Sequence, residues 1–331
     1  MEKLDTLNEI ANFTFTTKYA RYDEKKERRE TWKETVDRVK KMHLKKFNKL
    51  SVENKQQIEE AFKLVEDKYI IPSMRSMQFG GKAVEAHNAR IFNCSVKHID
   101  SIRSFAESFY ALLCGVGVGF GITDTFLDRL PNLVSADDKN GTVISYTVQD
   151  SIEGWSDSIE ALLNCYFKNT AYSGRKIVFD YSKIRPRGAK LKTGGGKAPG
   201  YKGLKSCHKK VKELLDYIIE EEGQKRMRTI NAYDILMHCA DAVLSGGIRR
   251  SACSVIFDAN DTEMMNSKTG NWFKENPQRA RSNNSAIIIR GSTTKKEFQE
   301  LINKTKEFGE PGFLYVIDNK QLLNPCFTID S

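Results

Sequence analysis

The sequence predicts an α/β protein with some parallel sheet, and three observations support this. Short apolar runs typical of strands alternate with amphipathic helical segments over most of the chain after residue 90. Hydrophobic residues make up 40% and charged residues 29% of the 331 positions, which excludes global disorder and allows a packed core. No internal repeat of the kind that builds solenoids is visible. The length suits two domains or one large α/β unit.

Helical periodicity dominates the start of the chain. From Thr31 to Lys68 apolar residues recur at a spacing of three to four positions, and they include Trp32, Val36, Val39, Met42, Ile58, Phe62 and Val65. Pro72 ends this pattern, because proline disfavours a helical residue before itself. We therefore expect a small helical region over residues 1–70, followed by an α/β body over residues 71–325.

The body is expected to alternate between strands and helices. Short apolar runs predict strands at residues 89–96, 176–180, 254–257, 286–289 and 313–316. Amphipathic patterns predict helices at residues 101–113, 151–167, 209–222, 232–244 and 294–308. Residues 114–121 are expected to form a strand or a loop, in which glycine alternates with apolar residues. This alternation indicates either tight packing or a backbone that approaches a ligand closely.

The chain is basic, and the excess charge is local. Lys and Arg number 53 against 43 Asp and Glu, for a formal net charge of +10. Residues 18–49 hold 13 basic and 6 acidic side chains, which is typical of a solvated helix face. Residues 183–212 hold 11 basic side chains and no acidic one, interleaved with glycine and proline. This composition predicts a mobile basic loop that suits a phosphate-bearing ligand.

Seven widely spaced cysteines without a CxxC pair argue against a disulfide framework or a zinc ribbon and favour a reducing compartment. Neither a secretory signal nor an apolar run long enough for a membrane helix is visible, so we expect a cytoplasmic protein without a membrane partner. Cys114, Cys165 and Cys239 lie among apolar neighbours and are expected in the core. Cys94 and Cys326 follow turn-like residues at strand ends, where functional residues of α/β folds gather.

Several functional alternatives stay open at this point. Ser73–Ser76 is either a polar turn or part of a site, and Arg249 and Arg250 form either a phosphate clamp or structural ion pairs. A nucleic-acid-binding protein would interleave aromatic residues with the basic ones, but residues 183–212 contain only Tyr201. A nicotinamide-dependent oxidoreductase is disfavoured, because the glycine-rich stretch lacks the GxGxxG fingerprint.

Ten motifs, in order along the chain, resemble the adenosylcobalamin-dependent (class II) ribonucleotide reductases, and most closely the ribonucleoside-triphosphate reductases. The matching stretches are PSMRSM at 72–77, FNCS at 92–95, GVGVGF at 115–120, EGW at 153–155, DYSKIRPRGAKLKTGGGKAPG at 180–200, AYDI at 232–235, GGIRRSA at 246–252, SNNS at 282–285, GEPG at 309–312 and NPC at 324–326. The series is far more specific than any single member. Within the family, an iron-dependent class I ribonucleoside-diphosphate reductase is the alternative.

This resemblance implies the N-terminal part of a ten-stranded α/β barrel made of two five-stranded halves. A finger loop inside the barrel would carry a radical cysteine, and the dry interior would protect the radical. The implied reaction reduces ribonucleoside triphosphates to deoxyribonucleoside triphosphates for DNA synthesis, with adenosylcobalamin as cofactor. A deoxynucleoside triphosphate effector and a thioredoxin-like reductant are implied as partners, and no nucleic acid is.

The resemblance also implies roles for individual residues. Cys94 takes the place of a reducing cysteine, Asn324 that of the finger-loop asparagine, and Cys326 that of the thiyl cysteine. The residues that match substrate-lining positions are Ser76, Asn93, Gly117 and Gly119. The residues that match the effector and specificity loop are Arg185, Arg187, Lys190, Lys192 and Lys197.

The match stops at the end of the chain. The family continues NPC with Gly-Glu-Ile, whereas Cys326 is followed here by Phe327 and the end of the sequence at Ser331. We therefore expect a fragment that is inactive alone, without the second half-barrel and the second reducing cysteine. The stretch 326–331, CFTIDS, resembles the start of an intein, a self-splicing insert. In that case Cys326 would be the splicing nucleophile, and the radical cysteine would follow the insert.

Overall fold

A computed structural model describes residues 2–137, 143–189, 197–244, 252–318, 320–323 and 325. The chain divides into two compact units, the first up to Asn93 and the second from Cys94 onward. Each unit has a hydrophobic core of its own. The described parts of the two units are therefore treated one at a time.

The first unit is mainly helical. It contains α1 (Glu2–Lys18), β1 (Tyr22–Asp23), β2 (Arg28–Arg29), α2 (Trp32–Lys46), α3 (Val52–Glu66), α4 (Met74–Phe79), α5 (Lys82–Ala86) and the 3-10 helix η1 (Asn88–Ile91). A capping box starts α2, because Thr31 and Glu34 each accept a hydrogen bond from the other's backbone N–H. Its core joins Val36 and Val39 of α2 to Val65 and Met77. The helices predicted after residue 31 are present, and α1 lies in the expected helical region, although no periodicity was identified for it.

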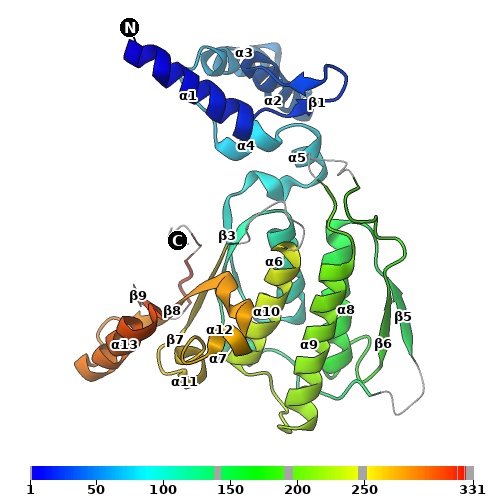
Figure 1. Ribbon diagram of the computed structural model, residues 1–331, viewed down its shortest axis with the longest axis vertical. Coiled ribbons are helices and arrows are strands. Elements are labelled where there is room, and N and C mark those ends of the chain that lie inside the picture. The colour runs from blue at the N-terminus through cyan, green and yellow to red at the C-terminus, as the bar shows by residue number, and fades with distance from the viewer. Residues whose placement is uncertain are drawn as a thin grey trace. The chain divides into compact units, whose positions relative to one another are not determined.

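A five-stranded, all-parallel sheet forms the centre of the second unit (Figure 1). Its strands, in spatial order, are β3 (Cys94–His98), β4 (Gly117–Gly121), β7 (Cys253–Asp258), β8 (Ser282–Ile289) and β9 (Gly312–Val316). The crossovers and insertions between them carry α6 (Ile102–Leu113), α7 (Asp124–Leu127), α8 (Ile152–Tyr166), α9 (Lys202–Glu220), α10 (Thr229–Leu244), α11 (Thr262–Met265), α12 (Trp272–Glu275), η2 (Pro277–Arg281) and α13 (Lys295–Phe308). The predicted α/β class with parallel sheet is confirmed.

The sheet is buried on both faces. Phe120, Val255 and Phe257 belong to the large core that the helices build. Ile256 and Ile287, which point the other way, belong to a second cluster. Burial on both faces explains why these strands read as continuous apolar runs and not as alternating ones.

A separate two-stranded parallel sheet pairs β5 (Ile144–Thr147) with β6 (Ile177–Asp180), and α8 connects the two strands. The apolar run 176–180 predicted a buried strand, and this is wrong in part. Val178 is 52% exposed, because a two-stranded sheet is covered on one face only. The strand β5 was not predicted.

Two other sequence predictions need correction. Residues 89–91 are not a strand but part of η1, because the N–H groups of Arg90 and Phe92 bond to carbonyls three residues back. The basic segment is not a loop throughout, since α9 begins at Lys202. A buried stripe at helical spacing overrides the glycine and lysine content there, and its members are Leu204, Cys207, His208, Val211, Leu215 and Ile218.

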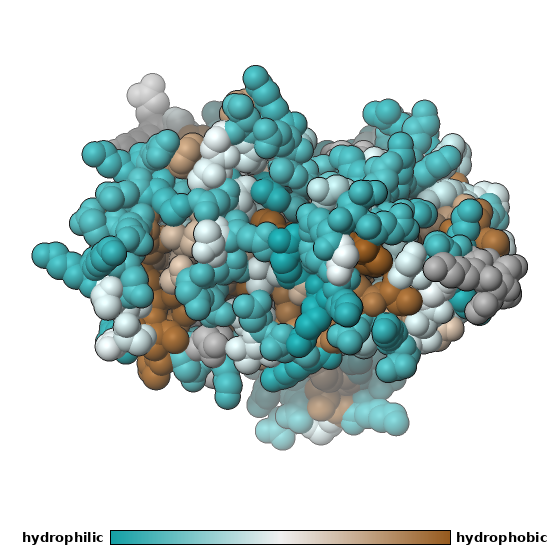
Figure 2. Space-filling model, turned by 90° about the horizontal axis from the view of Figure 1, so that it is seen from below, coloured by the Kyte–Doolittle hydropathy of each residue, from teal (hydrophilic) through white to brown (hydrophobic). Residues whose placement is uncertain are grey.

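The surface is mainly hydrophilic on the face that Figure 2 shows, and hydrophobic side chains reach it in separate patches. In the second unit the exposed large apolar side chains include Ile317 after β9 at 77%, Tyr217 on α9 at 55% and Phe273 on α12 at 54% exposure. Among the described residues, no helix is long and apolar enough to cross a membrane.

Candidate active site

Four of the sequence motifs meet at one edge of the sheet, where the strands begin. They are FNCS at β3, GVGVGF at β4, SNNS at β8 and GEPG at β9. The register pairs Cys94 with Gly117, and Val118 of the same strand with Cys253. Cys253 in turn pairs with Ser282, the first residue of β8. This amino edge is the opposite end from the carboxyl edge at which open α/β sheets usually bind ligands. Cys94 is half-buried there, and Gly117 and Gly119 are buried.

After β9 the chain turns back along the sheet, and we call residues 317, 318, 320–323 and 325 the strap. The imidazole Nε2 of His98, at the carboxyl end of β3, lies 3.0 Å from the Lys320 carbonyl oxygen. The Ser254 hydroxyl donates to the Leu323 carbonyl oxygen at 3.4 Å. A Cβ atom on Gly117 would lie 3.3 Å from Pro325 Cγ. The strap therefore runs antiparallel to β4, from the carboxyl edge to the amino edge.

The strap packs on the face of the sheet that the helices leave open. Leu322 and Leu323 are 6% and 5% exposed, and they complete the second cluster around Ile256, Ile287 and Val316. Close packing needs a glycine at one place, since a Cβ on Gly121 would lie 2.4 Å from Leu322 Cδ2. The strap thus packs on this face of the sheet and brings Pro325 to β4, the strand whose Gly117 pairs with Cys94.

In the first unit, the predicted substrate residue Asn93 is hydrogen-bonded to Arg75, the neighbour of the other predicted residue, Ser76. Arg75, beside Ser76 on α4, donates from Nε to the Asn93 side-chain oxygen at 2.9 Å. Ser73 caps the start of α4 by accepting from the Ser76 N–H. Ser76 is half-buried and Asn93 is exposed, so both are accessible to a ligand.

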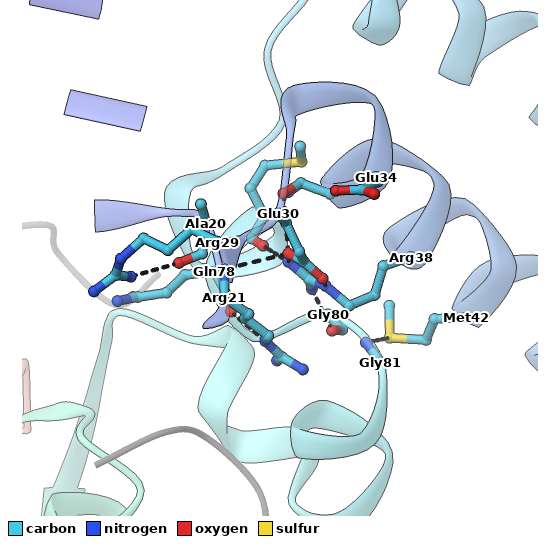
Figure 3. Close-up of polar contacts among 12 residues, drawn as sticks. Ala20, Arg21, Arg29, Glu30, Glu34, Arg38, Met42, Gln78, Gly80 and Gly81 are labelled. Atoms are coloured by element: carbon cyan, nitrogen blue, oxygen red, sulfur yellow. Dashed lines mark hydrogen bonds and ion pairs between the residues drawn. The ribbon is translucent and has the colours of Figure 1, made fainter. Parts of the chain in front are cut away.

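Two arginines hold the end of α4 (Figure 3). Arg38 donates to the carbonyl oxygens of Met77 at 2.9 Å and Gly80 at 2.6 Å, and Arg21 donates to that of Gln78 at 3.1 Å. These are the carbonyls that a helix end leaves without partners, and positive charge there also matches the helix dipole. The Glu30 carboxylate takes two hydrogen bonds from Arg38, which orients its guanidinium.

The predicted effector loop has a defined base in the second unit. The Gly188 N–H donates to the Ala198 carbonyl oxygen at 2.9 Å, and the Ala198 N–H donates to that of Ala189 at 2.7 Å. Arg187 and Lys197 flank this pair of bonds and are exposed. Arg185 lies deeper and donates to the Asp150 carboxylate at 2.7 Å. The loop base therefore presents two positive side chains to solvent and fixes the third.

Four candidate residues lie outside the described residues. They are Lys190 and Lys192 of the effector loop and Asn324 and Cys326 of the NPC motif. Arg249 and Arg250 also lie outside them. Their predicted roles stay predictions.

A buried polar network at the amino edge was not predicted, although two motifs pointed to its place. Lys268 is 7% exposed, and its ammonium lies 2.8 Å from the Glu310 carboxylate in the GEPG motif. Glu310 also accepts from the Asn284 N–H in the SNNS motif, at 3.3 Å. Burial lowers the pKa of Lys268, while the Glu310 charge opposes that shift. Lys268 also donates to the Ser282 carbonyl oxygen, so Lys268 and Glu310 together join the starts of β8 and β9.

A second buried network surrounds His208 on α9. Its Nε2 lies 2.8 Å from the Ser158 oxygen and its Nδ1 lies 2.8 Å from the Tyr181 oxygen. Ser158 donates its own proton to the Trp155 carbonyl, so Nε2–H donates to Ser158 and Tyr181 donates to Nδ1. Burial lowers the pKa of His208 to about 3. A neutral imidazole with both ring nitrogens paired is a core residue.

Comparison with known proteins identifies relatives for most of the chain. A family model described as "B12-dependent ribonucleotide reductase, insertion domain" matches residues 128–215. The adenosylcobalamin-dependent ribonucleoside-triphosphate reductase of Euglena gracilis is 30% identical over 71% of this chain and 30% of its own length. That of Lactobacillus gasseri is 27% identical over 92% of this chain and 48% of its own length.

A solved structure described as a B-12 dependent (class II) ribonucleotide reductase aligns with a TM-score of 0.75 and 25% identity. The alignment covers 92% of this chain and 48% of the chain in the solved structure. The chain thus spans about half the length, or less, of the relatives that it matches. These relatives all belong to the cobalamin-dependent class, which favours that class over the iron-dependent reductases and over nucleic-acid-binding proteins.

Proposed function

Because this chain belongs to the adenosylcobalamin-dependent (class II) ribonucleotide reductases, we propose that it is the N-terminal portion of a ribonucleoside-triphosphate reductase. The carrying observation is the strap, which runs along the open face of the parallel sheet and brings Pro325 to the strand beside Cys94. A finger loop inside a barrel requires this path. The five-stranded sheet would then be one half of a ten-stranded barrel, closed by the rest of the protein.

The proposed chemistry assigns Cys94 to the reducing step. A thiyl radical, expected at Cys326 or at the cysteine after an insert, takes the 3′ hydrogen atom of the ribose and later returns one. Cys94 and a second thiol from the rest of the protein give up two electrons and two protons. The 2′ hydroxyl leaves as water, and the two sulfurs join in a disulfide. A thioredoxin-like dithiol would then reduce that disulfide.

The remaining candidate residues would bind and orient the substrate. We assign Ser76, Asn93 and the proposed finger-loop residue Asn324 to polar contacts with the nucleotide, and Gly117 and Gly119 to close backbone approach. Adenosylcobalamin, when bound, supplies the radical by homolysis of its cobalt–carbon bond. Among the described residues, no group of three or more His, Cys, Asp or Glu side chains is placed to hold a metal ion, and none is assigned to the cofactor.

The basic loop would bind the phosphates of a deoxynucleoside triphosphate effector. Arg187 and Lys197 are exposed at its base, and Lys190 and Lys192 lie between them in the sequence. Arg185, held by Asp150, would fix the loop relative to the helix that follows Asp150. Guanidinium and ammonium groups match phosphate oxygens in charge and hydrogen-bond geometry.

The experiment uses the complete protein, with the downstream half supplied. Cys94→Ser should abolish multiple turnover with a dithiol reductant, whereas release of tritium from a 3′-tritiated substrate should continue. Cys165→Ser is the matched control, since Cys165 donates its S–H to the Ala161 carbonyl within α8 and a serine hydroxyl keeps that bond. Full thioredoxin-driven turnover of Cys94→Ser would refute the assignment.

We propose separately that residues 326–331 begin an intein, on the abrupt end of the family match after NPC. The DNA that follows codon 331 decides this. An intein body ending in His-Asn, followed by Cys-Gly-Glu-Ile, would support the proposal. Coding sequence that continues directly as reductase would contradict it.

A further inference from the structure

The first contact of the strap with the sheet lies close to the end of β9, since Lys320 follows Val316 by four positions. The hydrogen bond between His98 Nε2 and the Lys320 carbonyl oxygen, at 3.0 Å, ties this start of the strap to β3. Two residues further on, Leu322 fills the space that the missing side chain of Gly121 leaves. His98 and Gly121 are register partners on neighbouring strands, so both contacts come from one place at the carboxyl edge.

His98 is itself held rigidly. Its ring stacks on Phe126 of α7, with centroids 3.7 Å apart and planes 20° apart. The Arg129 guanidinium lies over the Phe126 ring, 4.9 Å from its centroid. A half-buried side chain that stacks in this way has lost most of its rotamer freedom already, so its hydrogen bond to the strap carries little further entropy loss.

The partner fixes the tautomer of His98. A carbonyl oxygen only accepts, so Nε2 carries the proton and Nδ1 carries a lone pair. Nδ1 is buried and has no hydrogen-bond partner among the described residues. A Cβ on Gly121 would lie 2.6 Å from this atom, so the lone pair faces the Gly121 backbone. Among the described residues, the His98 ring has an acceptor for its Nε2–H but none for a proton on Nδ1.

We infer that His98 is a positioning residue, which in its neutral Nε2–H form fixes the start of the strap and thereby the course of the chain up to Pro325. The inference rests on the proposed function only in one respect, namely that the chain near Pro325 takes part in the radical chemistry. The anchoring itself is a property of this chain and is tested without turnover.

This inference carries a pH dependence. Burial lowers the pKa of His98 below its usual value, and the positive charges of Arg129 and Lys97 lower it further. The Lys320 carbonyl and the Asp100 carboxylate raise it and so oppose this shift. The neutral form is therefore favoured in the folded state, and the anchor is complete at neutral pH. On acidification a proton on Nδ1 would be buried without an acceptor against Gly121, which favours release of the strap.

Hydrogen exchange of peptides that span residues 317–323, followed by mass spectrometry, tests the inference on the intact chain. His98→Ala should raise the exchange of these amides about ten-fold relative to the native chain at neutral pH, the equivalent of one lost buried hydrogen bond. In the native chain protection should fall on acidification, beyond the intrinsic pH effect, as His98 takes up its second proton. His98→Gln, whose amide N–H can replace Nε2–H but does not titrate, should keep the protection and lose this pH step.

Two further variants keep the test decisive. His43→Gln is the matched control, because His43 is also part-buried and bonds one backbone carbonyl, that of Val39, in the first unit. It should leave the strap unchanged. Gly121→Ala should also loosen the strap, because its Cβ would lie 2.4 Å from Leu322 Cδ2 and 2.6 Å from His98 Nδ1 and would displace both contacts. Unchanged strap exchange in His98→Ala, or the same pH step in the native chain and in His98→Gln, would overturn the inference.

Discussion

The stability of this chain should depend on pH through His208, and the size of the effect follows from its surroundings. The ring is 4% exposed, stacks on Phe179 with centroids 4.0 Å apart, and has both nitrogens paired in the neutral form. Burial lowers its pKa from 6.5 to about 3. The unfolded chain therefore binds a proton between these values that the folded chain does not, so the free energy of unfolding falls as the pH falls below about 6.5.

The magnitude at about pH 5 follows from the distance to the unfolded pKa. At that pH the unfolded imidazole is almost fully protonated and the buried one almost fully neutral. The difference is about 1.5 pH units at about 1.4 kcal/mol each, so His208 alone should lower the free energy of unfolding by about 2 kcal/mol relative to pH 8. His98 and His238 have lowered pKa values for the same reason and act in the same direction.

Urea unfolding at pH 8 and at about pH 5 measures the effect in the native chain and in two variants. His208→Gln keeps a donor and an acceptor near Ser158 and Tyr181, and His208→Phe keeps the stack on Phe179. Both variants lose stability at pH 8, but each should lose about 2 kcal/mol less than the native chain on acidification. The reasoning fails if the native chain and both variants show the same change in unfolding free energy between the two pH values.

Two further predictions concern stability. Asp234 accepts two hydrogen bonds from Arg279, at 2.8 and 2.7 Å, with side chains 9% and 13% exposed, so Asp234→Asn leaves a buried unpaired charge. Urea unfolding should show a loss of about 3–5 kcal/mol, and a loss below about 1 kcal/mol would contradict the pairing. Gly309 ends α13 with a φ of 77° and open space around its Cβ position, so Gly309→Ala should cost only the backbone strain, about 1 kcal/mol by thermal unfolding. A loss above about 3 kcal/mol would indicate a steric contact instead.

The sequence predicted the elements whose signal is local. The alternating glycines at 115–121 mark a strand, and β4 is buried at all five positions. The apolar runs of β7, β8 and β9 marked strands because both of their faces are covered. The first turns of α9, before Lys209, were missed for the opposite reason. Glycine, serine, cysteine and histidine have weak local helix preferences there, and only the packing of residues such as Leu204 and His208 against the core decides in favour of helix.

The candidate site was predictable as a set of motifs but not as an arrangement. Nothing near Cys94 in the sequence indicates that it pairs with Gly117, since that register depends on a crossover through α6. The contact of His98 with Lys320 joins residues 222 positions apart, and no local pattern announces it. The resemblance supplied the order of the motifs, and the fold supplies the contacts.

The place of the site at the amino edge has an electrostatic consequence. In parallel sheets the connecting helices run opposite to the strands, so helices end where strands begin. Here α6 ends at Leu113, four positions before β4 begins at Gly117, and α13 ends at Phe308, four positions before β9 begins at Gly312. The C-terminal ends of helices carry partial negative charge, unlike the helix N-termini that bind phosphates in dinucleotide-binding folds. The backbone field at this edge therefore disfavours an anion, and a triphosphate bound there would need neighbouring Lys or Arg side chains to offset it.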